Sequence, residues 1–474
     1  VLNLRLVVSP ADERVLVNSI EASRHIYNST LGTALKRLEN VRRDSDFASA
    51  RAMPKGKPRN DAFRAVNDKH GFTKYALQKV AERDRNACWI GDHLGSHDTQ
   101  QAAARAFTAV EQYAFGVRGR PRFKSVRRVR ALEGKSNAAV LTYRDGAIRY
   151  RGLRLPVQLD GRRKEREWQQ AALEHRIKYC RVLWKTVQGE RRWYAQLVLE
   201  GKPPVKDKHK AAFAAAEGKV VGLDLGPSTI AIVAGEHAAH LRIAADVEQP
   251  WAAQRRLRRK LDRSRRAMNP QNFRLDGTIK PGPKVWRTSS RYRAVARELA
   301  DVERVLAARR RTSHGRIANT VRAMGSEIKT EDVSHKAWQK CFGRSAKVRG
   351  AGLLQSLITR KAESAGGTVS LINTRATRLS QYCHMRDAYA RKPLSQRVHR
   401  FPDGRCVQRD LYSAFLATCV HKDRLDTHQV NVIWPDVDSV LQRAVSSLDQ
   451  LASVAREGGH DGVVGASRPQ TPCA

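Results

Sequence analysis

Three carboxylates stand out because each occupies a place where a lone negative charge is costly. Asp224 lies inside the apolar stretch 220–225, Glu331 ends a predicted strand, and Asp410 comes just before a predicted helix. An unpaired charge inside such a strand is expensive, and carboxylates brought together repel each other unless they hold cations. Two Mg²⁺ ions about 4 Å apart can activate water and stabilise the leaving oxygen of a phosphodiester. The three residues therefore predict metal-dependent phosphodiester hydrolysis.

Two other interpretations of these acids stay open at this point. Each carboxylate taken alone is also typical of a hydrogen-bonded turn. The pattern Asp-x-Gly-x-Ser at 224–228 also occurs in the phosphate-binding hairpin of sugar kinases and actin-like ATPases. The charge of the chain and the lack of a second glycine-rich phosphate loop count against the kinase and ATPase interpretation.

The charge of the chain points to a polyanionic partner. The 474 residues include 89 Lys and Arg against 46 Asp and Glu, which gives a formal net charge of +43. The basic residues are spread along the whole sequence, and RNA or DNA is the simplest partner to neutralise them. The alternative is a membrane-surface protein, but no apolar run is long enough to span a bilayer. Neutral enzymes acting on small molecules gain nothing from such self-repulsion.

Dense basic clusters lie between the first two carboxylates. We expect them to bind nucleic acid, and their members are Arg255, Arg256, Arg258, Arg259 and Lys260, then Arg309, Arg310 and Arg311. Apolar residues between the clusters repeat at helical spacing, so one helix face should pack and the other should show arginine. A merely solvated charged face is the alternative. Because few acids interleave, we predict contacts to the backbone of an RNA–DNA heteroduplex, which follow its shape and not its sequence.

Local patterns place these residues on elements. Alternating apolar residues predict a strand at 1–8, and helical periodicity predicts helices within 12–40 and 60–115. Asp145-Gly146 and Gln188-Gly189 are hairpin signals, so 125–200 should form a small β-barrel or sandwich. A Lys- and Ala-rich stretch at 201–219 reads as a linker.

The second half of the chain should mix strands and helices. A strand, a tight turn and a second strand are expected over 220–233. The basic stretch 251–322 should be mostly helical, with a Pro- and Gly-rich loop around Pro270 and Pro281. A helix at 351–366 and a strand at 368–372 follow. The seven cysteines are odd in number and widely spaced, which argues against a disulfide framework.

Several motifs, in order, resemble the TnpB nucleases of insertion sequences and the compact type V CRISPR effectors. The motifs are Gly119-Arg120-Pro121-Arg122-Phe123-Lys124, Val221-Gly222-Leu223-Asp224-Leu225-Gly226, Ile328-Lys329-Thr330-Glu331-Asp332-Val333, Leu379-Ser380-Gln381-Tyr382-Cys383 and Arg409-Asp410-Leu411-Tyr412-Ser413-Ala414. They are similar to the family's Gly-x-Pro-x-Phe-Lys segment, its first and second RuvC motifs, the entry to its zinc ribbon and its third RuvC motif. The resemblance spans most of the chain, with the specific motifs in its last part.

The resemblance implies a multidomain α+β chain. An RNase H-like (RuvC) α/β core would follow a small β-barrel that carries a helical recognition insertion. The implied domains are a wedge strand at 1–10, a helical recognition region at 11–124, a wedge β-barrel at 125–205, a RuvC-like core with basic helices at 206–378, a degenerate zinc-ribbon-like insertion at 379–409, the end of the core at 410–457 and a flexible tail at 458–474. By the same resemblance, Asp224, Glu331 and Asp410 carry catalysis and bind Mg²⁺.

The ribbon segment departs from the family. The family has two Cys-x-x-Cys pairs. Here the residue three positions after Cys383 is Arg386 and not cysteine, and Arg400 and Asp403 stand where the second pair should be. Structural zinc needs four ligands. Cys383 and Cys406 remain, with two histidines nearby, so a Cys/His zinc site is one alternative. The other, which we favour, is a degenerate ribbon without metal. The two histidines are His384 and His399.

Taken together, the sequence predicts an RNA-guided DNA endonuclease. Its partners would be a guide RNA and double-stranded target DNA, with a short flanking motif read by the protein and two Mg²⁺ ions as cofactor. No membrane and no small-molecule substrate are expected, and the setting would be the cytoplasm of a prokaryote, on the nucleoid when bound to target. Two alternatives remain: a cleavage-deficient RNA-guided repressor, and an unguided RNase H-type transposase or resolvase.

Overall fold

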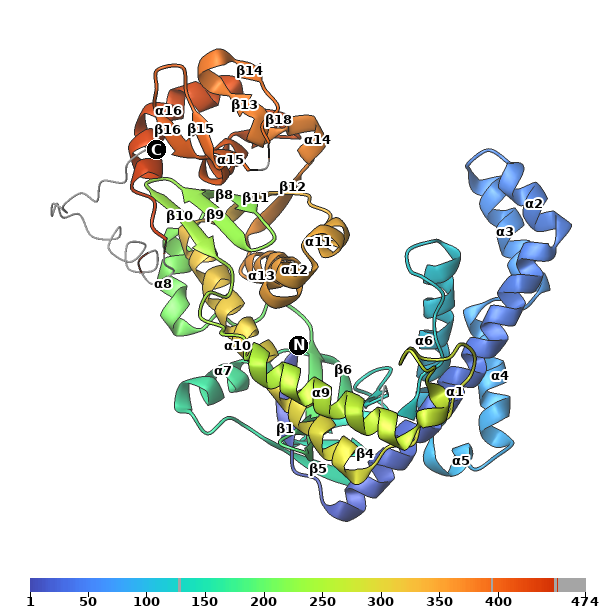
Figure 1. The fold of residues 1–474 in the computed structure, drawn as a ribbon. Coiled ribbons are helices and arrows are strands. Elements are labelled where there is room, and N and C mark those ends of the chain that lie inside the picture. Colours follow the sequence, from blue (N-terminus) through green and yellow to red (C-terminus); the bar gives the residue numbers. More distant parts are fainter. Residues whose placement is uncertain (127–128, 394, 447–449, 451–474) are drawn as a thin grey trace. The chain divides into compact units, whose positions relative to one another are not determined.

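The computed structural model describes residues 1–126, 129–393, 395–446 and 450 (Figure 1). The chain divides into two compact units, Val1–Gly201 and Lys202–Ala474. Helices and sheets occur in both, so the predicted α+β class is confirmed. The tail expected at 458–474 lies outside the described residues. No helix in the described part of the chain is both long and apolar enough to cross a membrane.

The helical part of the first unit follows its opening strand. A capping box starts the first helix: the Ser9 hydroxyl accepts the Asp12 backbone N–H at 3.2 Å, and the Asp12 carboxylate accepts from the Ser9 backbone. The helices are α1 (Pro10–Arg43), α2 (Ser45–Ala52), α3 (Lys57–Lys69), α4 (Lys74–Asn86), α5 (Ile90–His93) and α6 (Ser96–Ala114). Pro58 stands in the first turn of α3, where its missing N–H costs no helical hydrogen bond.

Seven strands of the described residues form an antiparallel sheet in the order β2-β6-β7-β1-β5-β4-β3. They are β1 (Leu2–Leu6), β2 (Ala131–Glu133), β3 (Leu141–Arg144), β4 (Ala147–Tyr150), β5 (Leu153–Gln158), β6 (Ile177–Val187) and β7 (Glu190–Leu199), with α7 (Arg163–Leu173) between β5 and β6. Both predicted hairpins are present. Their turns, Asp145-Gly146 and Gln188-Gly189, have positive φ at both residues, as a type I′ hairpin requires.

The sheet curls so that its two ends approach each other. A Cβ added to Gly134, just after β2, would lie 3.1 Å from the Leu141 carbonyl of β3 and 3.4 Å from the Cys180 carbonyl of β6. Asn137 connects β6 and β3. Its backbone N–H donates to the Lys178 carbonyl at 3.0 Å, and its side-chain Oδ1 accepts the Tyr143 N–H at 2.7 Å. The curled sheet therefore encloses one side of a core.

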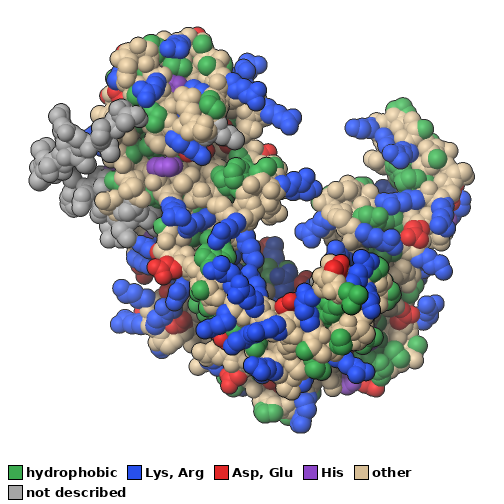
Figure 2. All heavy atoms as spheres, in the orientation of Figure 1, with side chains coloured by type: hydrophobic (Ala, Val, Ile, Leu, Met, Phe, Trp, Pro, Cys, Tyr) green, Lys and Arg blue, Asp and Glu red, His purple; other side chains and the backbone are tan. Residues whose placement is uncertain are grey.

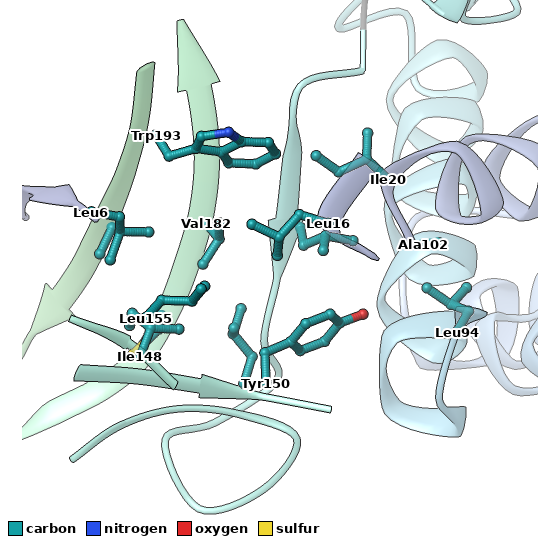
Figure 3. Close-up of a cluster of buried hydrophobic side chains, with 14 of the residues drawn as sticks. Leu6, Leu16, Ile20, Leu94, Ala102, Ile148, Tyr150, Leu155, Val182 and Trp193 are labelled. Carbon is teal, nitrogen blue, oxygen red and sulfur yellow. The ribbon is translucent and has the colours of Figure 1, made fainter. Parts of the chain in front are cut away.

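That core joins the sheet to the helices (Figure 3). Leu16 and Ile20 of α1 and Ala102 of α6 pack on the inner face of the sheet. The strand residues of this core include Ile148, Leu155, Val182 and Trp193. The Tyr150 ring reaches toward α6, and its hydroxyl donates to the Asp98 carboxylate at 3.2 Å. The helical region and the sheet are thus one folding unit.

A five-stranded sheet organises the second unit. Its order is β10-β9-β8-β11-β12. The strands are β8 (Val220–Leu225), β9 (Thr229–Ala234), β10 (His237–Arg242), β11 (Glu327–Glu331) and β12 (Thr368–Ile372). The first three form an antiparallel meander, and β11 runs parallel to both β8 and β12. The carboxyl ends of β8 and β11 therefore meet at the same edge of the sheet.

The rest of the second unit consists of helices and short strands, some of which pack against this sheet (Figure 1). Up to β12 they are α8 (Asp207–Ala215), α9 (Trp251–Met268), η2 (Pro270–Asn272), α10 (Ser290–Met324), α11 (His335–Cys341), α12 (Gly343–Arg349) and α13 (Ala351–Ser364). After it come α14 (Thr374–Thr377), η3 (Leu379–Gln381), β13 (Tyr382–Cys383), η4 (His384–Arg386), β14 (Ala388–Tyr389), β15 (Val398–Arg400), β16 (Cys406–Gln408), α15 (Arg409–Thr418), β17 (Val420–His421), β18 (Arg424–Leu425) and α16 (Thr427–Gln442).

The prediction of a linker at 201–219 is wrong over 207–215, where the chain forms α8. A buried arginine explains the helix. Arg322 of α10 donates to the Phe213 carbonyl at 3.2 Å, and its guanidinium pairs with Glu217 at 3.0 Å. Because this arginine is fully buried, the segment that satisfies it is held against α10. Composition alone does not reveal such a partner.

Candidate active site and basic helices

A close approach between a strand and a helix places two of the three acids. The helix α15 packs across β8 and β9. A Cβ added to Gly222 of β8 would lie 1.9 Å from the Ala414 carbonyl oxygen and 2.8 Å from the Thr418 methyl group. Only glycine fits this contact, because real Cβ atoms do not approach a backbone so closely. The first turn of α15, which carries Asp410, therefore lies beside the end of β8, which carries Asp224.

Both ends of α15 are fixed by side chains. At its carboxyl end, the Lys329 ammonium of β11 donates to the carbonyls of Thr418 at 2.9 Å and Val420 at 2.8 Å. At its amino end, the Gln408 side chain accepts the Leu411 N–H at 2.7 Å as an N-cap. A helix held in this way has little freedom to carry its acidic first turn away from the sheet.

The three acids are electrostatic neighbours. Burial raises the pKa of Asp224 well above its usual range, and the charges of Glu331 and Asp410 raise it further. Burial likewise raises the pKa of Glu331, which ends β11. Opposing these effects at Asp224 are the Arg409 guanidinium and the nearby Ser413 hydroxyl, which is itself buried and makes no well-formed hydrogen bond. The structure thus makes the three predicted carboxylates neighbours, with one guanidinium that only partly offsets their negative charges.

Asp410 has a different environment. Burial would raise its pKa, but hydrogen bonding to His240 and Gln408 and the charge of Arg409 bring the pKa below the usual range. The His240 Nε2 lies 3.6 Å from one carboxylate oxygen of Asp410, and the Arg409 guanidinium lies 3.4 Å from the other. This residue therefore stays ionised beside two acids that are pushed toward protonation, which is the separation expected of neighbouring carboxylates with no cation between them.

The charge balance of this cluster suits bound divalent cations. Three carboxylates face one guanidinium, and all three are oxygen donors of the kind that Mg²⁺ prefers. As the side chains stand, no three His, Cys, Asp or Glu residues in the described part of the chain form an arrangement that could hold a metal ion. The acids are thus neighbours that would have to draw together around a cation.

Sequence reasoning missed four residues that shape this site. His240 lies on β10 in an unremarkable alternating stretch, and nothing local marks it. Gly222, Arg409 and Ser413 stand within the motifs around Asp224 and Asp410 but received no role. The available signals were Arg409, directly before Asp410, and Gly222, two residues before Asp224.

The ribbon segment contains an aromatic core. His384 and His399 are buried there and pack against Phe401, Tyr412 of α15 and Trp434 of α16. The Tyr412 hydroxyl accepts the backbone N–H of His384 at 3.1 Å and lies 2.8 Å from its Nδ1. This core therefore joins the ribbon to the helix that bears Asp410.

The two histidines are poorly placed as zinc ligands. Because the Tyr412 hydroxyl already accepts one hydrogen bond, its proton can be donated to Nδ1 of His384, which leaves the ring proton on Nε2. His399 Nδ1 faces the Lys392 ammonium, which must donate, so its ring proton is also on Nε2. Burial lowers the pKa of both rings to about 4. Within the described residues neither Nε2 has a hydrogen-bond partner, and in these tautomers neither presents a lone pair to a metal. The ligand set Cys383, His384, His399 and Cys406 does not fit zinc as arranged.

Most members of the basic clusters point to solvent. Arg255, Arg256 and Arg259 of α9 are exposed, while Leu257 of the same helix is buried. Figure 2 shows Lys and Arg side chains gathered along α9. Within the described residues, these three arginines make no ion pair. The sequence prediction of one packed face and one arginine face therefore agrees with α9.

Three further cluster members differ. Arg258 pairs with Glu303 of α10 at 3.1 Å and so joins the two basic helices. Arg310 donates to the carbonyls of Lys347 at 2.9 Å and Val348 at 3.2 Å, which anchors α12. Lys260 is half-buried. Arg309 and Arg311 are exposed on either side of Arg310. The exposed members are thus the better candidates for contacts to nucleic acid.

No protein-family model matches this chain, and no curated protein matches its sequence. Two solved structures show a distant likeness. One is the cryo-EM structure of the Cas12f1–sgRNA–target DNA complex, with a TM-score of 0.46, 10% identity, and coverage of 86% of this chain and 82% of that chain. The other is the cryo-EM structure of a CRISPR-Cas12f ternary complex, with a TM-score of 0.27, 10% identity and the same coverage.

Proposed function

We propose that the protein is a metal-dependent endonuclease that RNA guides to double-stranded DNA. The observation that carries this proposal is the gathering of Asp224, Glu331 and Asp410 into one partly buried cluster, in which the charges of the other two acids raise the pKa of Asp224. The chain around that cluster carries a net charge of +43. An acidic site in so basic a protein is the combination that hydrolysis of a polyanion requires.

The arrangement of the second sheet supports the proposal. An antiparallel meander followed by two parallel strands, in the order β10-β9-β8-β11-β12, is what we expect of an RNase H-like (RuvC) core. In that core the acids would come from the first strand, the fourth strand and a late helix. Asp224 on β8, Glu331 on β11 and Asp410 on α15 hold those places.

The residues of the chain have distinct roles in this proposal. Asp224, Glu331 and Asp410 would hold two Mg²⁺ ions, which supply an activated water and stabilise the leaving oxygen. Arg409 partly offsets the negative charge of the cluster, and Ser413 faces Asp224. Gly222 lets α15 approach β8, so it sets the spacing between the acids.

Guide RNA and target DNA would be held largely through their backbones. Arg255, Arg256 and Arg259 of α9 and the exposed Arg309 and Arg311 make no ion pair within the part of the chain that the structure describes. Such contacts recognise the A-form shape of a heteroduplex and leave sequence reading to base pairing. The motifs that resemble TnpB and type V effectors are what favour a guided over an unguided nuclease.

One experiment tests both halves of the proposal. The protein is purified with its bound RNA, that RNA is sequenced, and matching duplex DNA is offered with and without Mg²⁺. We expect guide-dependent cleavage by the native chain and by Asp436→Asn, an exposed acid on α16 that serves as the control. Asp224→Asn should bind the target as well as the native chain but leave it intact. Guided binding without cleavage by the native chain would instead identify a repressor. Cleavage by Asp224→Asn at the native rate would contradict the site.

A further inference from the structure

A long loop, residues 269–289, joins the two basic helices and is held by hydrogen bonds from buried asparagine side chains. Asn269 is fully buried; its Nδ2 donates to the carbonyls of Arg265 at 2.8 Å and Arg287 at 2.9 Å. Its Oδ1 accepts the Arg287 N–H at 2.7 Å. Asn272, also buried, donates to the Val285 carbonyl at 2.8 Å. Loops of this length without much secondary structure are uncommon in compact domains unless they have a function.

The tip of the loop is a tight hairpin. Phe273 and Ile279 pair across it, and the Arg274 N–H donates to the Thr278 carbonyl at 2.8 Å. Gly277 turns the chain with a φ of 78°, and its carbonyl accepts from the Arg266 guanidinium at 2.9 Å. The tip is thus tied back to α9.

Aromatic rings stiffen the base of this hairpin. Phe273 and Trp286 meet edge to face at 5.7 Å between ring centroids. The guanidinium groups of Arg266 and Arg265 lie over these rings, at 4.9 Å from Phe273 and 5.4 Å from Trp286. Both arginines also pair with Asp262, so α9 contributes a packed platform under the loop.

This rigid tip presents an apolar side chain that folding does not use. Leu275 is fully exposed, with a relative accessibility of 109%. Single exposed leucines are common and need no explanation on their own. Here the leucine lies in the turn of a fixed hairpin, in a loop whose residues 269–289 include four cations and a single acid. The cations are Arg274, Lys280, Lys284 and Arg287, and the acid is Asp276, whose carboxylate accepts from Thr278.

We propose that the loop 269–289 is a wedge that packs Leu275 on the face of a terminal base pair of an RNA–DNA duplex. The four cations would hold the phosphates on either side. Apolar side chains are inserted or stacked at interrupted base steps in many nucleic-acid complexes. The inference rests on the proposed nucleic-acid partner and adds a place where the duplex ends.

Charge decides between this occupant and others. A second copy of the chain would bring the same cations and a net charge of +43, so self-association through the tip is repulsive. An anionic lipid surface would satisfy the cations. However, the loop follows directly on α9, whose Arg255, Arg256 and Arg259 are exposed, and a basic helix followed by a basic loop fits the line of phosphates along a duplex.

The test uses the purified full-length chain, in EDTA, with an RNA–DNA duplex that carries 2-aminopurine at its terminal or at an internal position. Binding should change the fluorescence of the terminal probe and leave that of the internal probe nearly unchanged. Leu275→Ser should remove most of the terminal change while duplex affinity falls less than about threefold, since phosphate contacts dominate affinity. Leu353→Ser, on α13 and 62% exposed, is the matched control and should behave as the native chain.

A second variant isolates the cations. Lys280→Gln with Lys284→Gln should reduce the slope of log affinity against log salt by about 1.8, or about 0.9 for each lost phosphate contact. The proposal is overturned if Leu275→Ser leaves the terminal signal intact, if Leu275 affects only binding to vesicles of anionic phospholipid or only oligomeric mass, or if no duplex binds. Because no cleavage is needed, a chain that shows the Leu275-dependent signal but never cuts DNA would refute the nuclease and leave the wedge standing.

Discussion

Adding one methyl group at Gly222 should separate Asp410 from Asp224 without removing either carboxylate. In Gly222→Ala the new Cβ would start 1.9 Å from the Ala414 carbonyl oxygen. Real contacts are not shorter than 3.0 Å, so helix and strand must part by about 1.1 Å, the difference between these values. The obstacle is backbone, which cannot rotate away as a side chain could. Asp410 would move with α15, whereas Asp224 stays on β8.

Two magnitudes follow from that displacement. Overpacking of this kind costs about 1–3 kcal/mol. For a chain of this size that corresponds to a fall in melting temperature of about 2–4 °C per kcal/mol. Misplacement of a catalytic group by about 1 Å can cost about 100-fold in rate. We therefore expect a protein that folds and binds its target but cleaves far more slowly.

The assay compares single-turnover cleavage, target binding and thermal melting for three proteins. Gly343→Ala is the control, because a Cβ at Gly343 of α12 meets nothing within 4 Å. It should match the native chain in all three measurements. A Gly222→Ala protein that melts lower yet cleaves within about threefold of the native rate would refute the claim that this contact sets the spacing of the acids.

Three further predictions concern other parts of the chain. Tyr412→Phe removes the hydroxyl that binds His384, so cleavage should need more Mg²⁺ for half-maximal rate while target binding is unchanged; an unaltered Mg²⁺ titration would contradict it. Elemental analysis of the RNA-bound protein should find less than one zinc per chain, because neither ring nitrogen Nε2 offers a lone pair, and a stoichiometric zinc lost on Cys383→Ser would reverse this view. Burial raises the pKa of Asp98 to about 6, so the folded chain binds this proton more tightly than the unfolded chain and stability should fall as pH rises from about 4 to about 6. Melting curves of Asp98→Asn should show a smaller fall over that range.

Elements with local signals were predictable from the sequence. The Asp145-Gly146 and Gln188-Gly189 turns have the positive φ angles that those residue pairs favour, and both hairpins formed. The apolar run around Asp224 became a strand as expected. In each case the information lies within a few residues of the feature, so no tertiary contact was needed to foresee it.

Features that depend on distant partners were not predictable. The helix α8 exists because Arg322, far along the chain, is buried against it. The packing of segment 379–409 relies on rings at three separate places in the chain, Phe401, Tyr412 and Trp434. His240 joins Asp410 only because β10 lies near the start of α15. Residue type alone gives no hint of such meetings.

The charge balance at the acidic site determines when a phosphate can enter it. When all three are ionised, the carboxylates carry −3 against +1 on the Arg409 guanidinium, a sum of −2. A phosphodiester therefore meets net repulsion, which for two like charges about 4 Å apart is about 4 kcal/mol in a protein-surface environment. Binding by the basic helices is free of this obstacle.

In EDTA we thus expect full-strength duplex binding but no protection of the phosphates at the site in a hydroxyl-radical footprint. Ca²⁺, which can occupy oxygen sites, should add protection confined to a few phosphates. Asp224→Asn removes one negative charge. If repulsion alone keeps the phosphates out, this variant should show protection at a lower cation concentration than the native chain. Footprints that are identical with and without the cation would show that the acids do not face the nucleic acid, and would remove the site from the mechanism.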